Sequence, residues 1–355
     1  MITNYQELPI REEMKKAIAE MGFTEMTEIQ QKAIPELLAG KEVIAKAPTG
    51  TGKTCAFGVP MVQRIQPEKG YVQGVILCPT RELCLQITEE LQKLGKYIPG
   101  FSIVAVYGGQ SMQPQINALR KNPQIVVATP GRLMDHMRRR NVAIDRTEMI
   151  VLDEADEMLD MGFVDDIEEI MRSLPVERQT LLFSATMPRP ILSLTKKYMK
   201  APKNVTISKE ELTVPLIEQY YFETKDKIEG LCRLLDAEID GKLIIFCRTK
   251  KGVDDLSIAL SSRGYMAEGL HGDLSQNQRD RVMKKFREGA VDVLIATDVA
   301  ARGIDVDNIT HVINFDIPQD PESYVHRIGR TGRAGNTGVA MTLSLIHISE
   351  PTRRS

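Results

Sequence analysis

The stretch EVIAKAPTGTGKT, residues 42–54, places a glycine-rich loop directly after a short apolar run. Glycines at 50 and 52 permit the tight turn in which backbone N–H groups point at phosphate oxygens. Lys53 is placed to reach the β- and γ-phosphates of a nucleotide. Thr54 is placed to start a helix and to ligate Mg²⁺ through its hydroxyl. Taken alone, these residues also fit a glycine-rich turn with a surface lysine.

A second motif favours the phosphate-binding loop over a glycine-rich surface turn. The stretch MIVLDEAD, residues 149–156, is an apolar run that ends in Asp153 and Glu154. Open α/β sheets bind ligands at the carboxyl ends of their strands, so these two acids are expected beside the loop. We expect Asp153 to hold the metal ion and Glu154 to orient and deprotonate the attacking water. Most of the acids that follow are interpreted as a solvated helix face: Asp160, Asp165, Asp166, Glu168 and Glu169.

Short apolar runs with strand character recur along the chain: EVIAKA, GVILCP, SIVAVY, QIVVAT, MIVLDE, TLLFSA, KLIIFC, VDVLIAT and THVINF. They alternate with amphipathic stretches such as RELCLQITEELQKLGKY, residues 81–97. This alternation predicts an α/β fold whose strands form mostly parallel sheets flanked by helices. A polar stretch with Pro215 separates two strand series, so we predict domains over 1–207 and 217–342, joined by a linker at 208–216.

Composition limits the class of protein. The chain has 355 residues, with 46 basic and 48 acidic side chains, which suits two soluble domains and lacks the basic excess common among nucleic-acid binders. There is no apolar run of membrane-spanning length and no secretory signal pattern, so we expect no membrane association. Five cysteines without a CxxC pair favour the reducing cytoplasm over a disulfide or zinc scaffold.

Further motifs occur in a fixed order: GFTEMTEIQ (22–30), PTREL (79–83), GG (108–109), TPGR (129–132), SAT (184–186), LIIFCRT (243–249), HGD (271–273), ATDVAARGID (296–305) and HRIGRTGR (326–333). With the loop and the DEAD string at 153–156, this series resembles the DEAD-box family of ATP-dependent RNA helicases. The resemblance covers about residues 5–342.

The resemblance implies two RecA-like domains with the active site in the cleft between them, and ATP and Mg²⁺ as cofactors. It implies an RNA-stimulated ATPase that locally unwinds RNA or remodels RNA–protein complexes. An ATP-gated RNA clamp with little unwinding is the alternative. A DNA helicase fits less well, because DEAD together with SAT marks the RNA-directed branch. The core is expected to be monomeric, and the sequence names no protein partner.

The resemblance also assigns roles to single residues. Besides Lys53, Asp153 and Glu154, the catalytic group includes Arg330 and Arg333, as arginine fingers that neutralise transition-state charge after domain closure. Gln30 is expected to read adenine and Tyr5 to stack on it, with Asp305 at the ribose. The ATP-binding set is Tyr5, Gln30, Thr49, Gly50, Thr51, Gly52, Lys53, Thr54 and Asp305, and the metal set is Thr54 and Asp153.

Hydrolysis and RNA are expected to be coupled through Ser184, Thr186, His326 and Arg327, the last two by pairing with acids near DEAD and SAT. Capping of the following helix is the simpler role for the SAT hydroxyls. The RNA set contacts the backbone without reading bases. Its members are Thr80, Arg81, Gly108, Gly109, Thr129, Gly131, Arg132, Arg248, Thr249, Gly272, Gln276, Arg279 and Thr297. The run Arg138–Arg140 either extends this surface or is a solvated helix end.

The end of the sequence departs from the family pattern. Residues 343–353, LSLIHISEPTR, resemble the translated end of a transposase-based sequencing adapter. We therefore predict that residues 343–355 are a non-native tail and that the second domain lacks its last helix. Unrelated codons in the underlying nucleotide sequence would contradict this prediction.

Overall fold

The computed structural model describes residues 2–48, 50–207, 217–237, 241–301, 306, 308–318, 321–332 and 337–345, with the side chains of residues 276, 321 and 322 excepted. The chain divides into two units, Met1–Glu211 and Leu212–Ser355. The division falls within the segment predicted as a linker. Each unit is described by itself below.

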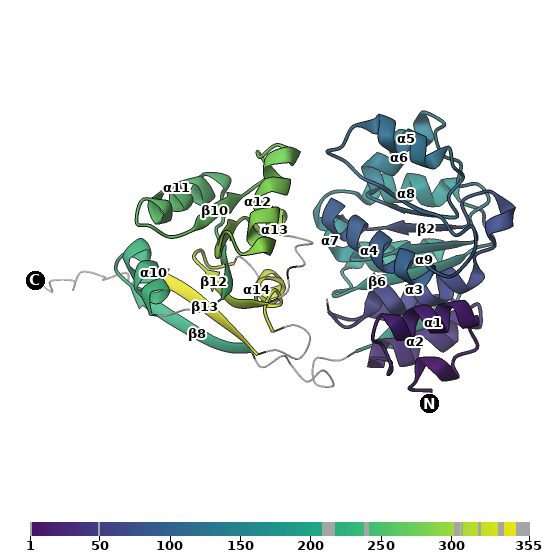
Figure 1. The fold of residues 1–355 in the computed structure, drawn as a ribbon, viewed down its shortest axis with the longest axis horizontal. Coiled ribbons are helices and arrows are strands. Elements are labelled where there is room, and N and C mark those ends of the chain that lie inside the picture. The colour runs from purple at the N-terminus through teal and green to yellow at the C-terminus, as the bar shows by residue number, and fades with distance from the viewer. Residues whose placement is uncertain are drawn as a thin grey trace, which may run out of the picture. The chain divides into compact units, whose positions relative to one another are not determined.

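The first unit is built on a seven-stranded sheet of order β3-β4-β2-β5-β6-β1-β7, and every recorded strand pair in it is parallel (Figure 1). The six apolar runs predicted in this half of the chain all form strands. The strands are β1 (Val43–Lys46), β2 (Gly74–Leu77), β3 (Ile103–Val106), β4 (Ile125–Ala128), β5 (Met149–Leu152), β6 (Gln179–Ser184) and β7 (Lys203–Thr206).

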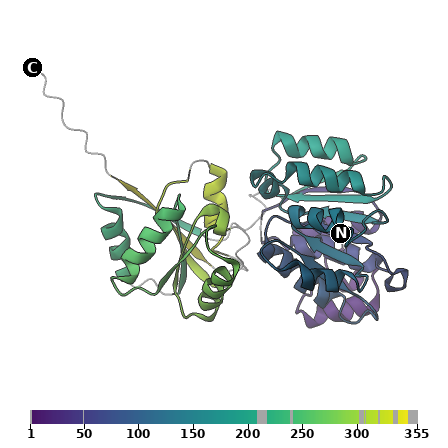
Figure 2. The same cartoon turned by 90° about the horizontal axis from the view of Figure 1, so that it is seen from above.

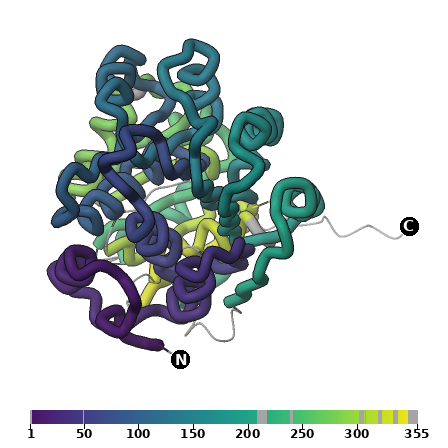
Figure 3. Tube along the Cα trace, turned by 90° about the vertical axis from the view of Figure 1, so that its right-hand side faces the viewer, coloured from purple at the N-terminus to yellow at the C-terminus, as the bar shows by residue number. Residues whose placement is uncertain are grey.

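Helices cover both faces of this sheet (Figure 2). The helical elements are η1 (Tyr5–Glu7), α1 (Glu12–Glu20), α2 (Glu28–Leu38), α3 (Lys53–Arg64), η2 (Pro67–Lys69), α4 (Arg81–Leu94), α5 (Met112–Leu119), α6 (Pro130–Arg138), α7 (Ala155–Asp160), α8 (Val164–Ser173) and α9 (Arg189–Tyr198). The purple start of the chain runs through α1 and α2 along one side of the unit (Figure 3). Strands β2, β4, β5 and β6 are buried at every position, as expected for a sheet covered on both faces.

The second unit has a six-stranded sheet of order β10-β11-β9-β12-β13-β8, again with parallel recorded pairs. Its strands are β8 (Ile217–Thr224), β9 (Lys242–Phe246), β10 (Ala267–Leu270), β11 (Val293–Ala296), β12 (Ile309–Asn314) and β13 (Gly338–Leu345). Its helices are α10 (Lys227–Asp236), α11 (Lys250–Ser261), α12 (Gln276–Glu288), α13 (Asp298–Ala301) and α14 (Pro321–Ile328). Both sheets confirm the predicted parallel α/β class.

Strand β13 continues three residues past the predicted end of the second domain at 342. Leu343 is 1% exposed and pairs with Phe222 of β8, whereas Leu345 is 43% exposed. The strand thus runs past 342, with Leu343 as an apolar side chain at a core position, and the domain boundaries stay predictions. The origin of residues 343–355 stays a prediction.

Among the described residues, no helix is both long enough and apolar enough to cross a bilayer. All five cysteines are unpaired and buried, as expected for small packing residues.

The position of Leu343 generates a stability prediction. Leu343→Ala should lower the free energy of unfolding of the second unit by about 2–5 kcal/mol, because it leaves a cavity between β13 and α10. Hydrogen exchange measured by mass spectrometry on peptides from β9 and β12 would show faster exchange. Leu345→Ala, two residues along the same strand, is the matched control and should change exchange little. Equal effects of the two variants would contradict the burial of Leu343.

Candidate active site

Strand order brings the predicted nucleotide motifs together. Strands β5, β6 and β1 are neighbours, in parallel register from Val43 with Leu181 to Lys46 with Ser184. Parallel strands end at the same edge of a sheet. The glycine loop follows β1, the SAT residues close β6, and Asp153 follows β5. These three motifs therefore share one edge of the first unit.

The loop after β1 has the geometry of an anion site. Gly50 and Gly52 have φ of 82° and 87°, which glycine adopts without strain. Helix α3 starts at Lys53 directly after Gly52, so its first N–H groups face the loop. The Lys53 ammonium is buried and 4.0 Å from Asp153 Oδ1, with no hydrogen-bond partner among the described residues.

The two acids after β5 differ in environment. Asp153 is 2% exposed and accepts a hydrogen bond from the Glu154 N–H at 3.0 Å. Burial raises the pKa of Asp153 to about 7, while Lys53 acts in the opposite direction. Glu154 has left-handed backbone, with φ of 50° and ψ of 52°. A non-glycine residue held there is strained, which is common among residues positioned for chemistry.

These features fit a nucleoside triphosphate bound together with a magnesium ion. A buried ammonium whose N–H groups have no acceptor among the described residues favours an anionic ligand, and the N-terminus of α3 adds backbone donors for phosphate. The described residues contain no group of three or more His, Cys, Asp or Glu able to hold a metal ion by themselves. That fits Mg²⁺, which is usually bound by one or two protein oxygens together with phosphate oxygens and waters.

Gln30 is tied to the phosphate loop. Its Nε2 donates to the Gly52 carbonyl at 3.0 Å, and its Oε1 accepts from the Thr27 N–H and the Tyr5 hydroxyl, at 2.8 and 2.6 Å. Thr27 Oγ1 donates to the Thr51 carbonyl at 2.8 Å. Both Gln30 groups that would read adenine are thus engaged within the protein. Base recognition by Gln30 therefore requires an exchange of these hydrogen bonds.

Tyr5 lies beside Gln30, but its ring is covered. The side chain is 1% exposed, and burial raises the pKa of its hydroxyl. The stacking role of Tyr5 therefore stays a prediction, and stacking requires a face of the ring to become accessible.

The two threonines of the loop that the structure describes differ in exposure. Thr51 is buried, and its hydroxyl donates a hydrogen bond to the Pro48 carbonyl at 2.9 Å. Thr54 lies half-buried in the first turn of α3.

The SAT residues bond to the last acid of the DEAD string. Asp156 Oδ2 accepts from both the N–H and the hydroxyl of Thr186, at 2.7 and 2.9 Å. The Ser184 hydroxyl accepts from the Asp156 N–H at 3.2 Å. The following helix α9 begins at Arg189 with Pro188 as its N-cap, so the helix-capping alternative for these hydroxyls is wrong. Asp156 itself was not among the predicted site residues.

The predicted RNA residues of the first unit follow three neighbouring strands, β3, β4 and β2. Thr80 caps α4 by accepting from the Leu83 N–H, and the Arg81 guanidinium stacks on the Tyr107 ring at 5.0 Å. Arg132 donates to the Gln110 carbonyl at 2.9 Å. The glycine and threonine members lie at the same loops and helix starts: Gly108 and Gly109 after β3, and Thr129 and Gly131 at the start of α6.

The second unit repeats this arrangement on β10, β11 and β9. Gly272 follows β10, Thr297 follows β11, and Arg248 and Thr249 follow β9, where Thr249 caps α11. Arg279 donates to the Ala300 carbonyl at 2.7 Å. Thr49, Asp305, Arg333 and the Gln276 side chain lie outside the described residues.

The Arg327 side chain is bound within the second unit. Its guanidinium binds Asp298 through two bonds of 2.5 and 2.8 Å and also reaches Asn314 Oδ1 at 3.1 Å. Arg327 therefore pairs with an acid of its own unit, and its predicted pairing with acids near DEAD or SAT stays a prediction. Arg330 follows one turn later and is 8% exposed, and His326 is half-buried on the same helix. Their catalytic and coupling roles stay predictions.

Arg138 also finds a partner, since its guanidinium lies 3.1 Å from the Glu169 carboxylate of α8. Both side chains are exposed, which agrees with the solvated helix end that was one of the two interpretations.

Thr27, a residue of the site that was not predicted, lies in a sequence pattern that could have identified it. Thr27 and Gln30 have the spacing of a capping box, which would have indicated that both lie at the start of α2. For Asp156 and Asp298 no such signal exists, because their partners are 30 and 29 residues away.

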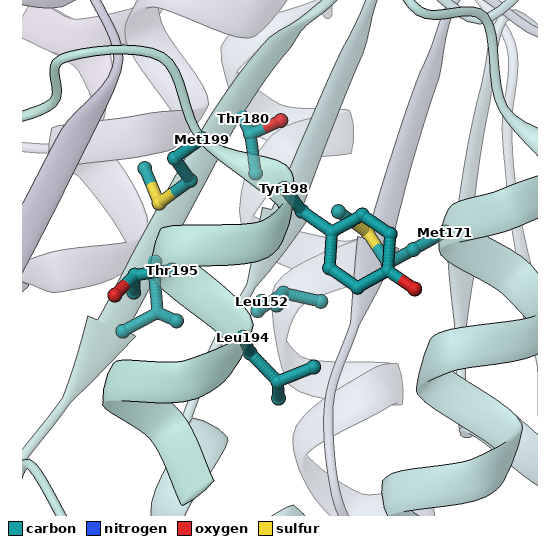
Figure 4. Close-up of a pocket in the computed structure, with 8 residues that line it drawn as sticks. Leu152, Met171, Thr180, Leu194, Thr195, Tyr198 and Met199 are labelled. Carbon is teal, nitrogen blue, oxygen red and sulfur yellow. The ribbon is translucent and has the colours of Figure 1, made fainter. Parts of the chain in front are cut away.

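A small cavity beneath α9 does not compete with this site (Figure 4). It measures about 10 Å³ and its lining is apolar, with Leu152, Leu194, Tyr198 and Met171 around it. That volume holds at most about one water molecule. It is a packing gap between α8, α9 and the sheet.

The contact between Gly52 and Gln30 generates a prediction about ATP affinity. A Cβ at Gly52 would lie 2.4 Å from Gln30 Nε2, whereas one at Gly50 meets nothing within 4 Å. Both positions have left-handed backbone, where an L side chain costs roughly 1–2 kcal/mol. We expect Gly50→Ala to weaken ATP binding by about tenfold and Gly52→Ala to weaken it further. Calorimetric titration with an ATP analogue measures both, and equal affinities would contradict a role for the Gln30 contact.

Comparison with known proteins agrees with this geometry. Residues 27–194 match the family model of the DEAD/DEAH box helicase, and residues 226–335 match the helicase conserved C-terminal domain. The chain is 52% identical to the DEAD-box ATP-dependent RNA helicase CshA of Geobacillus kaustophilus, over 99% of this chain and 77% of that protein. It is 54% identical to CshA of Listeria monocytogenes, over 96% of this chain and 66% of that protein.

A solved structure of Saccharomyces cerevisiae Dbp5 bound to RNA and ADP–BeF3 is similar, with a TM-score of 0.87 and 36% identity over 98% of this chain and 90% of Dbp5. Two family models in the expected order, and more than 50% identity to curated helicases, establish the assignment. The chain belongs to the DEAD-box family of ATP-dependent RNA helicases.

Proposed function

We propose that this chain couples ATP hydrolysis to RNA binding and to local unwinding of short RNA duplexes or remodelling of RNA–protein complexes. The observation that carries the proposal is the buried Lys53 ammonium beside Asp153, which has no hydrogen-bond partner among the described residues, at the sheet edge where β6 also ends. The relatives named above are helicases, and the Dbp5 structure holds RNA together with a nucleotide. They favour unwinding over the clamp alternative.

In the proposed mechanism, the N–H groups of residues 50–54 and Lys53 bind the phosphates. Thr54 and Asp153 would hold Mg²⁺, which when bound neutralises charge on the phosphate oxygens. Lys53 also keeps a positive charge next to Asp153, which favours the ionised carboxylate needed for that role. Glu154 orients the attacking water and accepts its proton.

Arg330 and Arg333 would supply the remaining positive charge. Because they belong to the second unit, turnover would require the two units to close around the nucleotide. The rigid Arg327–Asp298 pair supports this proposal, since it anchors the helix that leads into Arg330. Within the first unit, Asp156 links the DEAD string to Thr186, which provides a direct connection between the acidic site and the coupling residues.

RNA would be bound along the loops after β3, β4 and β2 of the first unit and after β10, β11 and β9 of the second. Backbone N–H groups at glycines and helix starts bind phosphates without adding formal charge. This explains how a chain of net charge −2 can bind RNA. Such contacts read the backbone, so binding should be largely independent of base sequence.

The first test replaces the proposed general base. Glu154→Gln keeps the size of the side chain but removes its basicity, so RNA-stimulated ATP hydrolysis should fall by about 10²-fold or more. Steady-state phosphate release with and without single-stranded RNA measures this. Asp160→Asn, a similar change on the exposed end of α7, is the matched control and should leave turnover unchanged. Equal turnover of Glu154→Gln and the parent chain, or stimulation by DNA but not RNA, would contradict the proposal.

The second test concerns the arginine finger. Arg330→Ala should reduce turnover by about 10³-fold, because transition-state charge is left uncompensated, and should leave ATP affinity nearly unchanged. Single-turnover hydrolysis and equilibrium ATP binding measure the two quantities separately. Arg263→Ala removes an exposed arginine of the same unit and serves as the control. A loss of ATP affinity that matches the loss of turnover would instead make Arg330 a binding residue.

A further inference from the structure

His136 is a fully buried histidine that the mechanism above does not use. It lies near the end of α6, the helix that starts with the TPGR motif, and is 0% exposed. Its Nε2 lies 3.1 Å from Gln115 Oε1, and its Nδ1 lies 3.2 Å from Asn141 Nδ2. Gln115, on α5, is itself 3% exposed. Two buried polar side chains thus bond directly across two helices.

The surroundings of Gln115 fix the direction of every hydrogen bond in this pair. Gln115 Nε2 donates to the Tyr107 carbonyl at 2.9 Å and to Gln110 Oε1 at 3.0 Å. A reversed amide would set its oxygen against the Tyr107 carbonyl and its N–H groups against the Arg132 guanidinium, 3.4 Å away. Gln115 Oε1 therefore faces His136, and His136 Nε2 must carry the proton.

The second ring nitrogen of His136, Nδ1, fits the same tautomer. Neutral His136 with its proton on Nε2 has an acceptor at Nδ1, which matches the donor Nδ2 of Asn141. Burial, together with Arg132, lowers the pKa of His136 and so favours this neutral form. The pair is a fixed donor–acceptor chain and not a titrating switch.

This chain of bonds ends on the predicted RNA residues. Gln115 holds the Tyr107 carbonyl, directly before Gly108 and Gly109, and the Tyr107 ring lies under Arg81. Arg132 donates to the Gln110 carbonyl, directly after the same glycines. The loop that carries the two glycines is therefore held on both sides, by Gln115 and by Arg132.

We propose that His136 and Gln115 are positioning residues for RNA: they lock the Gly108–Gly109 loop against Arg132 and Arg81, so that three backbone-binding motifs form one rigid surface. The inference rests on the proposed RNA-binding role of those motifs. Preorganised donors bind phosphates without a further ordering cost, so loss of the lock should weaken RNA binding and leave the ATP site unaffected.

The test compares His136→Leu with His136→Gln. Leucine cannot donate to Gln115 Oε1, whereas the glutamine amide can place an N–H where Nε2–H lies. For His136→Leu we expect the RNA concentration for half-maximal ATPase stimulation to rise about fivefold or more, in line with one buried hydrogen bond. Turnover at saturating RNA and ATP affinity should stay within about twofold of the parent chain, and His136→Gln should restore RNA affinity.

Gln115→Glu is a second variant. Because glutamate has nearly the same shape as glutamine, this variant tests the proposal even if His136→Leu disturbs folding. Its carboxylate cannot donate to the Tyr107 carbonyl, and it should show the same selective loss of RNA affinity. Gln113→Leu, on the exposed side of α5, is the matched control and should behave like the parent chain. Anisotropy of a labelled twelve-nucleotide oligouridine with a nonhydrolysable ATP analogue gives the affinity directly.

The possible outcomes separate this inference from the proposed function. If the parent chain shows no RNA stimulation, the proposed function fails. If the parent chain is stimulated and both His136→Leu and Gln115→Glu bind RNA as it does, the positioning role is wrong. Parallel losses of RNA and ATP affinity, or failure of His136→Gln to restore RNA binding, would also overturn the positioning role and indicate general packing instead.

Discussion

The adjacency of β5, β6 and β1 in one parallel sheet is the constraint on which the active site depends. Lys53 lies 100 residues before Asp153, and Ser184 lies 31 residues after Asp153, so it is the shared strand edge that brings the three together. Each β–α–β connection returns the chain to the same edge, because crossovers between parallel strands must pass over a sheet face. Functional loops therefore accumulate at the carboxyl ends.

Strand order also separates the predicted nucleotide residues from the predicted RNA residues of the first unit. In the first unit the nucleotide motifs follow β5, β6 and β1, while the predicted RNA motifs follow β3, β4 and β2. The boundary lies between β2 and β5, which are paired directly. The second unit gathers its RNA motifs on β10, β11 and β9 in the same way. A shift transmitted across the β2–β5 pair would therefore connect one function to the other.

Much of this arrangement could be predicted from the sequence. The nine apolar runs became strands because a strand covered on both faces needs apolar residues at every position. Four strands were not predicted: β10, β13, β7 and β8. Of these, β7 is mostly exposed and polar, and β8 is exposed from Glu218 to Tyr221 at a sheet edge. Their apolar content is too low to distinguish them from loops.

The sequence patterns predict single residues of the candidate site but not the bonds between them. Motif spacing identified Lys53, Asp153 and Arg132, because each lies within a short pattern. The bonds between Arg327 and Asp298 and between His136 and Gln115 join residues far apart in the sequence. Such pairs depend on which strands become neighbours, and a single sequence has no local signal for that.

The pairing of β8 with β13 has a consequence for synthesis of the chain. Among the described residues of the second unit, β8 (Ile217–Thr224) is the first strand, and its partner β13 (Gly338–Leu345) is the last. The first unit has all seven of its strands by Thr206 and can fold while the rest is still being translated. The second unit cannot complete its sheet until more than 100 further residues have left the ribosome. During that interval the backbone N–H and C=O groups of β8 that pair with β13 in the folded unit have no strand partner, so β8 is open to pairing with another extended segment.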